Sequence, residues 1–132
     1  MLKRQLQALL DRSRFLRPYR FRVVTVKDGQ CTLELPHRPI LERPGGIING
    51  PALMAAADCA MWLAIKGRLG VEQDALTSEL NTAFLSPAIG EHVYCTAEIL
   101  KMGRRRIYGV AKCHAKNGRL FSHHTLTYIR PD

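Results

Sequence analysis

Apolar residues follow two different periods along the first part of the chain. Over 1–11 they recur at helical spacing and predict a short amphipathic helix, the start of an N-terminal helical extension over 1–17. Over 19–26 and 31–35 they alternate with polar residues instead, and the Asp28-Gly29 pair between these segments is a tight-turn signal. We therefore expect a helix followed by a β-hairpin.

One long helix is predicted after a loop over 37–46, a segment that holds two prolines and two glycines. Asn49 is a suitable N-cap for this helix, and Pro51 is well tolerated in its first turn. Gly67 and Gly70 bracket its end. The helix is rich in alanine, which favours close approach to other backbone, as in a helix wrapped by a sheet.

Extended segments make up the rest of the chain, over 75–85, 92–101, 107–115 and 120–129. The last two are separated by Asn117-Gly118, a strong hairpin signal. A hairpin, a long buried helix and then a run of strands predict an α+β fold, with one antiparallel sheet curled around a central helix. The length of 132 residues is that of a single domain, expected to span 1–132.

Composition narrows the class of protein. Hydrophobic residues at 46% and charged residues at 23% are typical of a soluble globular protein. The most apolar stretch, 47–65, contains Asp58, and a carboxylate in the middle of a membrane span is costly. The basic N-terminus lacks the uncharged core of a signal peptide. We therefore expect no membrane span and a cytoplasmic location.

The net charge of +9 suggests an anionic partner, unless it serves solubility alone. Nucleic acid, an anionic membrane surface and a phosphorylated small molecule all fit this charge. No helix-turn-helix, zinc finger or interleaving of aromatic with basic residues is present, so nucleic-acid binding is not favoured. The four cysteines are widely spaced, and no histidine stands at metal-ligand spacing from them. They predict buried thiols in a reducing compartment and no metal site.

Three motifs resemble those of phenylacetate-degradation-type (PaaI-type) hotdog thioesterases. Residues 45–60, GGIINGPALMAAADCA, are similar to the signature that places His and glycines before a helical Asp. Residues 77–88, TSELNTAFLSPA, look like the family's next strand, and residues 101–106, KMGRRR, look like its Gly-Arg turn. The resemblance covers roughly residues 20–130, and the first two motifs together are fairly specific for the fold.

The resemblance implies a hotdog subunit that forms dimers, and usually dimers of dimers, with two active sites per dimer. It implies an acyl-CoA thioesterase that splits the thioester into free acid and CoA, with CoA as part of the substrate and no other cofactor. Carried over to this chain, the N–H of Gly50 polarises the thioester carbonyl, and Asp58 is the nucleophile or general base. Alone, such an Asp could equally be turned to solvent or be satisfied by backbone donors.

Three departures from the family pattern affect the groups around the carbonyl. Asn49 replaces the usual His and takes its place as a candidate catalytic residue, Pro51 replaces the second Gly, and Arg43 stands where some members have Asn. Proline has no N–H, but the donor in question belongs to Gly50 and is retained. These departures keep a non-catalytic acyl-CoA-binding protein open as an alternative. An acyl-thioester dehydratase or hydratase is a weaker alternative, because Asn49 cannot act as its base.

The spacing of Gly50 and Asp58 predicts a site shared between subunits. Eight residues at about 1.5 Å each separate them by about 12 Å along one helix. A reacting carbonyl needs both groups within about 3–3.5 Å. One helix cannot provide this, whereas two antiparallel helices related by a two-fold axis can.

Further site residues are predicted with a structural alternative beside each. Thr77 or Ser78 could hold the attacking water or be ordinary strand residues. Arg104, Arg105 and Arg106 could clamp the phosphates of CoA or form a solvated strand end. Candidates for the acyl pocket, rather than the core alone, are Met54, Met61, Trp62 and Phe84. His123 and His124 have no Cys or carboxylate at suitable spacing and are expected to be surface or core residues.

Overall fold

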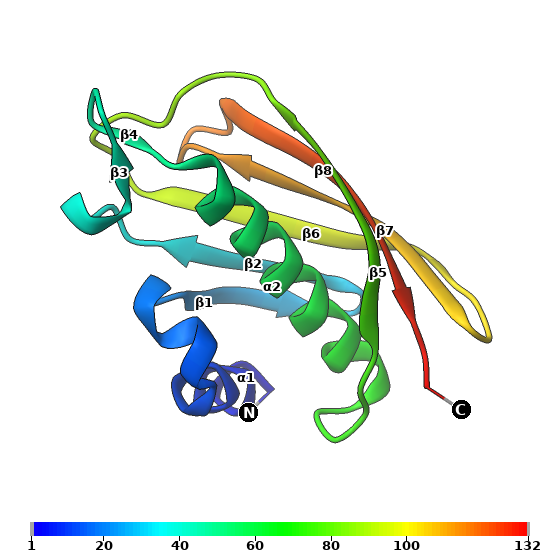
Figure 1. The fold of residues 1–132 in the computed structure, drawn as a ribbon. Helices are drawn as coiled ribbons and strands as arrows, with labels where there is room; N and C mark the ends of the chain where they lie inside the picture. Colours follow the sequence, from blue (N-terminus) through cyan, green and yellow to red (C-terminus); the bar gives the residue numbers. More distant parts are fainter. Residues whose placement is uncertain (1, 132) are drawn as a thin grey trace.

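The structure is a computed structural model that describes residues 2–131. Its main sheet is antiparallel and curls around one long helix (Figure 1). The strand order is β1 (Arg22–Lys27), β2 (Gln30–Leu35), β6 (Val93–Met102), β7 (Arg106–His114), β8 (Leu120–Ile129) and β5 (Leu76–Phe84). The other elements are α1 (Leu2–Arg12), η1 (Arg14–Tyr19), η2 (Pro39–Leu41), α2 (Gly50–Leu69), and the ribbon of β3 (Glu42–Arg43) with β4 (Ile47–Ile48). The predicted α+β architecture is confirmed.

Both predicted hairpins form. Lys27 pairs with Gln30, which leaves Asp28-Gly29 as the turn, and Gly29 takes a φ of 71°. The Asn117-Gly118 pair lies in the turn between β7 and β8, with Gly118 at a φ of 93°. A positive φ of this kind is inexpensive for glycine only, which explains why the turns form at these residues.

Two local predictions were wrong. The strand expected from Tyr19 begins at Arg22, because Tyr19 closes the 3-10 helix η1 and Arg20 turns the chain in the left-handed region. Pro18, inside η1, has no N–H to donate to a sheet. The segment expected as a plain loop over 37–46 contains η2 and β3, whose partner strand β4 begins just beyond it.

The long helix α2 begins and ends where the sequence indicates. The Asn49 side chain accepts a hydrogen bond from the N–H of Ala52 at 2.8 Å, and Gly70 is the C-cap. The helix packs mainly on β6, β2 and β7. Its approach to β7 is close: a Cβ built on Gly109 would lie 2.4 Å from Cε of Met61. No helix within residues 2–131 has the length and apolar character needed to cross a membrane.

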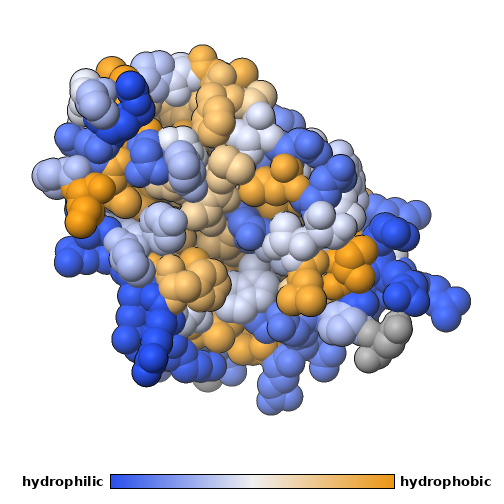
Figure 2. Space-filling view, viewed as in Figure 1, coloured by the Kyte–Doolittle hydropathy of each residue, from blue (hydrophilic) through white to orange (hydrophobic). Residues whose placement is uncertain are grey.

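One stripe of α2 is left uncovered by the sheet. It consists of Pro51, Met54, Ala55, Asp58 and Trp62, all of them half-buried or exposed. Figure 2 shows apolar surface gathered over α2 on this face, with strongly hydrophilic surface around α1. The neighbouring edge strand β5 is also exposed along most of its length, including Leu76 and Phe84. The described chain thus leaves an apolar helix stripe and a strand edge without a covering layer.

All four cysteines are free and buried, as predicted. Burial raises the pKa of Cys31 to about 12, so this thiol is unreactive at neutral pH. His124 is buried in the core, one of the two places expected for it, and its Nε2 lies 3.7 Å from Sγ of Cys113 and 2.8 Å from Oγ of Ser122. The contact joins adjacent strands, where Cys113 pairs with Ser122, so spacing along the chain does not reveal it.

Candidate functional site

Asp58 occupies the centre of the uncovered stripe of α2, and two hydroxyl groups fix its carboxylate. Thr77 Oγ1 on β5 donates to Oδ1 of Asp58 at 2.7 Å. The Tyr128 hydroxyl on β8 lies 2.6 Å from the same Oδ1 and 2.8 Å from the main-chain oxygen of Asp58. Oδ2 has no hydrogen-bond donor among residues 2–131, so one carboxylate oxygen is held and the other is available.

Tyr128 is a site residue that the sequence reasoning missed. Its side chain is buried, and burial, followed by the charge and hydrogen bond of Asp58, raises its pKa far above the ordinary value. The hydroxyl therefore remains a hydrogen-bond donor throughout the physiological pH range. The available signal was the alternation of β8, which places Tyr128 on the inner face with Leu126, but alternation does not reveal contact with Asp58.

The carboxylate faces a cavity of about 370 Å³ between α2, β5 and η1. Asp58, Thr77 and Tyr128 all line it. So does Trp62, one turn further along α2, whose Nε1 donates to Asp74 at 3.2 Å. The structure therefore brings together three of the residues of interest, Asp58, Thr77 and Trp62, and adds Tyr128. The Thr77 hydroxyl donates to Asp58, and its oxygen can still accept a hydrogen bond from water, so its role in holding water stays a prediction.

Gly50 begins α2 and lies in a second cavity with Phe84 and Arg43. The Phe84 ring packs directly on it, since a Cβ built on Gly50 would lie 3.0 Å from Cζ of Phe84. Within residues 2–131 the Gly50 N–H has no acceptor, as expected for the first N–H groups of a helix. The positive end of the helix dipole lies at this N–H, so the position favours a developing negative charge.

The Asn49 side chain makes two hydrogen bonds to the backbone. Its Oδ1 caps α2, and its Nδ2 donates to the main-chain oxygen of Leu41 at 2.7 Å. Its own N–H donates to the same oxygen at 2.9 Å. Because both ends of the side-chain amide are engaged, Asn49 holds the start of α2 and so positions Gly50. The predicted N-cap is confirmed, and the candidate catalytic role of Asn49 stays a prediction.

The remaining predicted binding residues are not all gathered at these cavities. Met54 lies half-buried on the uncovered stripe, between the two cavities, and Met61 is buried in the core. Gly50 and Asp58 line different cavities, in agreement with a separation of about 12 Å along the helix. One subunit therefore does not bring the N–H of Gly50 and the carboxylate of Asp58 to one point.

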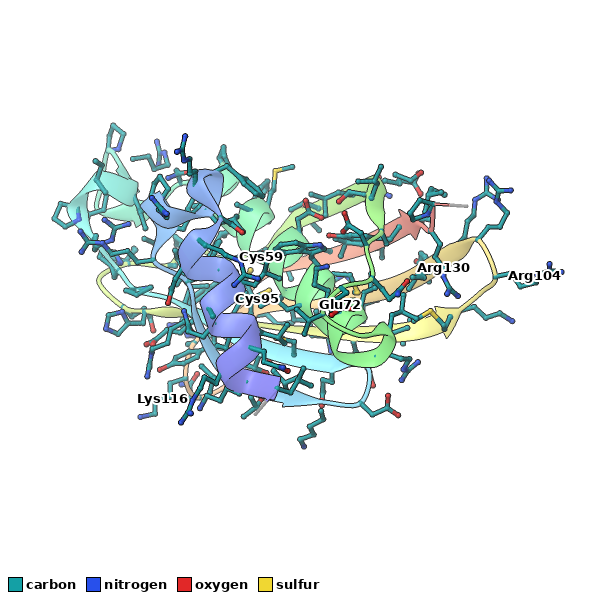
Figure 3. All side chains as sticks on the ribbon, turned by 90° about the horizontal axis from the view of Figure 1, so that it is seen from below. Cys59, Glu72, Cys95, Arg104, Lys116 and Arg130 are labelled. Atoms are coloured by element: carbon teal, nitrogen blue, oxygen red, sulfur yellow. The ribbon has the colours of Figure 1, made fainter. Side chains whose placement is uncertain are left out.

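The arginine cluster lies at one end of the molecule. Arg104 and Arg105 are in the turn between β6 and β7, and Arg106 begins β7. A further basic residue, Arg130, joins them: its N–H donates to the main-chain oxygen of Arg105 at 2.7 Å, and both side chains line an open cavity with Arg104. Figure 3 shows Arg104 and Arg130 at this end, away from Cys59, the neighbour of Asp58 in the sequence.

A sheet curled around one long helix, with a fixed carboxylate on the helix, defines a hotdog-fold protein of the thioesterase class. The family model described as Thioesterase superfamily matches residues 45–122, more than half of the chain. The chain therefore belongs to the thioesterase superfamily. Hydrolysis of thioesters is the general activity that this membership supports.

The chain is similar to other proteins along most of its length. "Putative esterase Ta0293" of Thermoplasma acidophilum is 29% identical over 114 residues, which cover 86% of each chain. Zebra fish thioesterase superfamily member 2 has a similar structure, with a TM-score of 0.86 and 22% identity. The match covers 98% of this chain and 96% of the zebra fish chain. A thioesterase family protein from Silicibacter pomeroyi has a TM-score of 0.87 and 24% identity, and the match covers 98% of this chain and 97% of that protein. At these identities the two structures show a shared fold.

Proposed function

We propose that this protein is an acyl-CoA thioesterase of the PaaI type, which hydrolyses an acyl-CoA to the free acid and CoA. The observation that carries the proposal is the fixed carboxylate of Asp58 at the wall of a cavity, with Oδ1 held by Thr77 and Tyr128. Hydrogen bonds to Oδ1 orient the carboxylate, and Oδ2 remains to attack the acyl carbon or to deprotonate water. This is the arrangement that a nucleophile or a general base requires.

The second requirement is a donor for the oxyanion that forms at the carbonyl oxygen. The Gly50 N–H, at the N-terminus of a 20-residue helix, supplies it. One well-placed donor of this kind stabilises a transition state by about 3–4 kcal/mol. Phe84 packs against Gly50 and adds an apolar wall to the cavity in which this N–H lies.

The complete site requires a second copy of this chain. Gly50 and Asp58 line separate cavities in one subunit, whereas antiparallel α2 helices across a two-fold axis bring Gly50 of one subunit to Asp58 of its partner. Two uncovered surfaces support such a dimer: the apolar stripe of α2 and the exposed edge strand β5. An exposed strand edge carries unpaired N–H and C=O groups that a second strand satisfies.

The basic cluster supports CoA rather than another thiol as the leaving group. Arg104, Arg105 and Arg130 line one open cavity, and arginine binds phosphate groups bidentately. The pantetheine arm separates the nucleotide of CoA from the thioester, so this clamp does not need to adjoin Asp58. The cluster also accounts for part of the net charge of +9.

The second candidate function is acyl-CoA binding without hydrolysis. It is favoured by one observation: Asn49, where related enzymes have His, caps α2 with its Oδ1 and donates to Leu41 with its Nδ2. Because Asn49 stands in place of that His and cannot act as a base, a dehydratase activity is not supported.

Turnover of a panel of acyl-CoAs, measured as release of free thiol beside calorimetric binding of the same panel, separates the two functions. Hydrolysis by the parent and its loss in Asp58→Asn are expected. Tight binding of acyl-CoAs with no thiol release would contradict the proposal and support the binding protein.

A further inference from the structure

The cavity beside Asp58 is built in part by a segment that lies outside the family match. Its walls come from α2, from β5 with the loop before it, and from the 3-10 helix η1, which contributes Phe15, Leu16 and Tyr19. The thioesterase match begins at residue 45, so η1 lies outside the matched region, as β1 and β2 also do. Because η1 forms part of the wall, its side chains can affect which substrates the site accepts.

The segment η1 is held firmly enough to act as a wall. Ser13 accepts backbone hydrogen bonds from Leu16 and Arg17 at 3.0 and 3.2 Å, and its own hydroxyl donates to the main-chain oxygen of Leu9 in α1 at 2.7 Å. Tyr19 stacks on Phe21, with ring centroids 5.1 Å apart. These contacts fix the backbone of η1 on both sides of Phe15.

The side chains around the cavity are apolar and partly uncovered. Phe15 is 74% exposed and Leu76 65% exposed, although both are large hydrophobic residues at its wall. Trp62 forms a third apolar surface, and its ring is fixed by the hydrogen bond to Asp74 and by Lys66, whose Nζ lies 5.2 Å from the ring centroid. An apolar ligand that removes these surfaces from water gains free energy.

The charged side chains that line the cavity disfavour a ligand whose apolar tail ends in an anionic group. Asp58 and Asp74 both line it, and its lining within residues 2–131 includes no lysine or arginine. Lys66 lies 3.9 Å from Asp74, but its Nζ is buried and donates to the main-chain oxygens of Val71 and Gln73. A carboxylate at the end of an acyl tail would be repelled by Asp58 and Asp74 and would meet no lysine or arginine among the described lining residues.

We propose that this cavity is the acyl pocket and that η1, through Phe15, selects uncharged, apolar acyl groups. The inference rests on the proposed function, because it takes Asp58 as the group at the thioester. The carbonyl end of the acyl group lies at Asp58, its tail packs between Phe15, Trp62 and Leu76, and Asp74 rejects tails that end in a carboxylate.

Three CoA thioesters test the proposal: octanoyl-CoA, suberoyl-CoA of the same chain length with a terminal carboxylate, and acetyl-CoA with no tail. For the parent, kcat/KM on octanoyl-CoA is expected to exceed that on suberoyl-CoA by at least about tenfold. Phe15→Ala is expected to lower the octanoyl-to-acetyl ratio by roughly tenfold, the scale on which apolar pockets discriminate. Asp74→Asn, which keeps a hydrogen-bond acceptor for Trp62, is expected to lower the octanoyl-to-suberoyl ratio.

Ile40→Ala is the matched control, because Ile40 is 80% exposed and lines no cavity near Asp58. It should leave both ratios at their parent values. A parent that accepts suberoyl-CoA as well as octanoyl-CoA would overturn the proposal, and so would a Phe15→Ala variant that loses octanoyl and acetyl turnover equally. A parent that hydrolyses none of the three overturns the proposed function only. The same ratios, measured as dissociation constants, then decide whether the pocket selects the tail.

Discussion

Asp58 lies on the one stripe of α2 that the sheet leaves uncovered, and its environment is polar on one side only. Thr77 and Tyr128 engage Oδ1, and the cavity borders the carboxylate. Asp58 is only half-buried, and it lines the cavity, so its Oδ2 is open to water or to a bound substrate. The carboxylate is therefore both oriented and accessible, as a chemical role requires.

Asp58→Asn tests that role. The substitution keeps the shape and the acceptor for Thr77 and Tyr128 but removes the nucleophile or base. We expect kcat to fall by at least roughly 10²-fold, the lower range for loss of a positioned acid–base group, with little change in Tm. Initial rates and thermal unfolding of the two proteins provide the measurement. Activity within a factor of three of the parent would show that Asp58 is structural.

Thr77 and Tyr128 are positioning residues in this account. Thr77→Val and Tyr128→Phe each remove one donor to Oδ1. Each is expected to lower kcat by about tenfold, equivalent to about 1.4 kcal/mol, while KM stays near its parent value, because the interaction orients a reacting group. Thr77→Ser keeps the hydroxyl and should restore most of the activity. A Thr77→Ser variant as slow as Thr77→Val would show that packing of Thr77, and not its hydroxyl, matters.

At the scale of residues, the sequence predicted part of the site. Asp58 stood out because a charged residue interrupts an apolar helix, and Gly50 stood out through its motif. Tyr128 could not be found, since 70 residues separate it from Asp58 and only the curl of the sheet brings β8 over α2. The N-cap at Asn49 was predicted, but the hydrogen bond from its Nδ2 to Leu41 needed the structure.

At the scale of elements, the turn between β6 and β7 carries the clearest prediction. Replacing Arg104, Arg105 and Arg106 with serine should raise KM for acyl-CoA thioesters and leave kcat near the parent value. Contacts to the nucleotide phosphates are present in the ground state and the transition state alike. A truncated thioester without the nucleotide should be affected much less.

Lys116→Ser is a control for loss of positive charge, since Lys116 lies at the opposite end of the molecule from Arg104 (Figure 3). Equal losses on the full and the truncated thioester would show that the arginine cluster supports folding or assembly.

The helices and strands themselves were predicted more accurately than the residues at which they begin and end. The caps of α2 and the two glycine turns are encoded locally, by Asn49, Gly70, Gly29 and Gly118, and appear where expected. The start of β1 was misplaced because alternation continues through Tyr19, while Pro18 and the left-handed Arg20 keep that segment out of the sheet. The cavity wall formed by η1 could not be predicted, because it depends on how α1 docks beside β1.

At the scale of the whole molecule, the account depends on a second copy of the chain. The sequence predicted this from the distance between Gly50 and Asp58, and the structure adds the uncovered stripe of α2 and the exposed β5 edge. Within one subunit, the Gly50 N–H and the Asp58 carboxylate lie too far apart along α2 to reach one carbonyl. The central claim is therefore that the site is shared between two subunits.

Mixed dimers of two inactive variants test that claim most directly. Gly50→Pro removes the oxyanion donor, and Asp58→Asn removes the carboxylate, so each homodimer should be nearly inactive. Gly50→Ala is the control for Gly50→Pro, because it adds a Cβ against Phe84 in the same way but keeps the N–H. Gel filtration establishes that every variant assembles.

The measurement is the hydrolysis rate of verified mixed dimers, obtained by co-expression with two different affinity tags and purification through both. One of the two sites in such a dimer joins an intact Gly50 to an intact Asp58, while the other carries both lesions. The account predicts that mixed dimers recover about half of the parent activity. Mixed dimers as inactive as the two homodimers would contradict a site built from Gly50 of one subunit and Asp58 of the other.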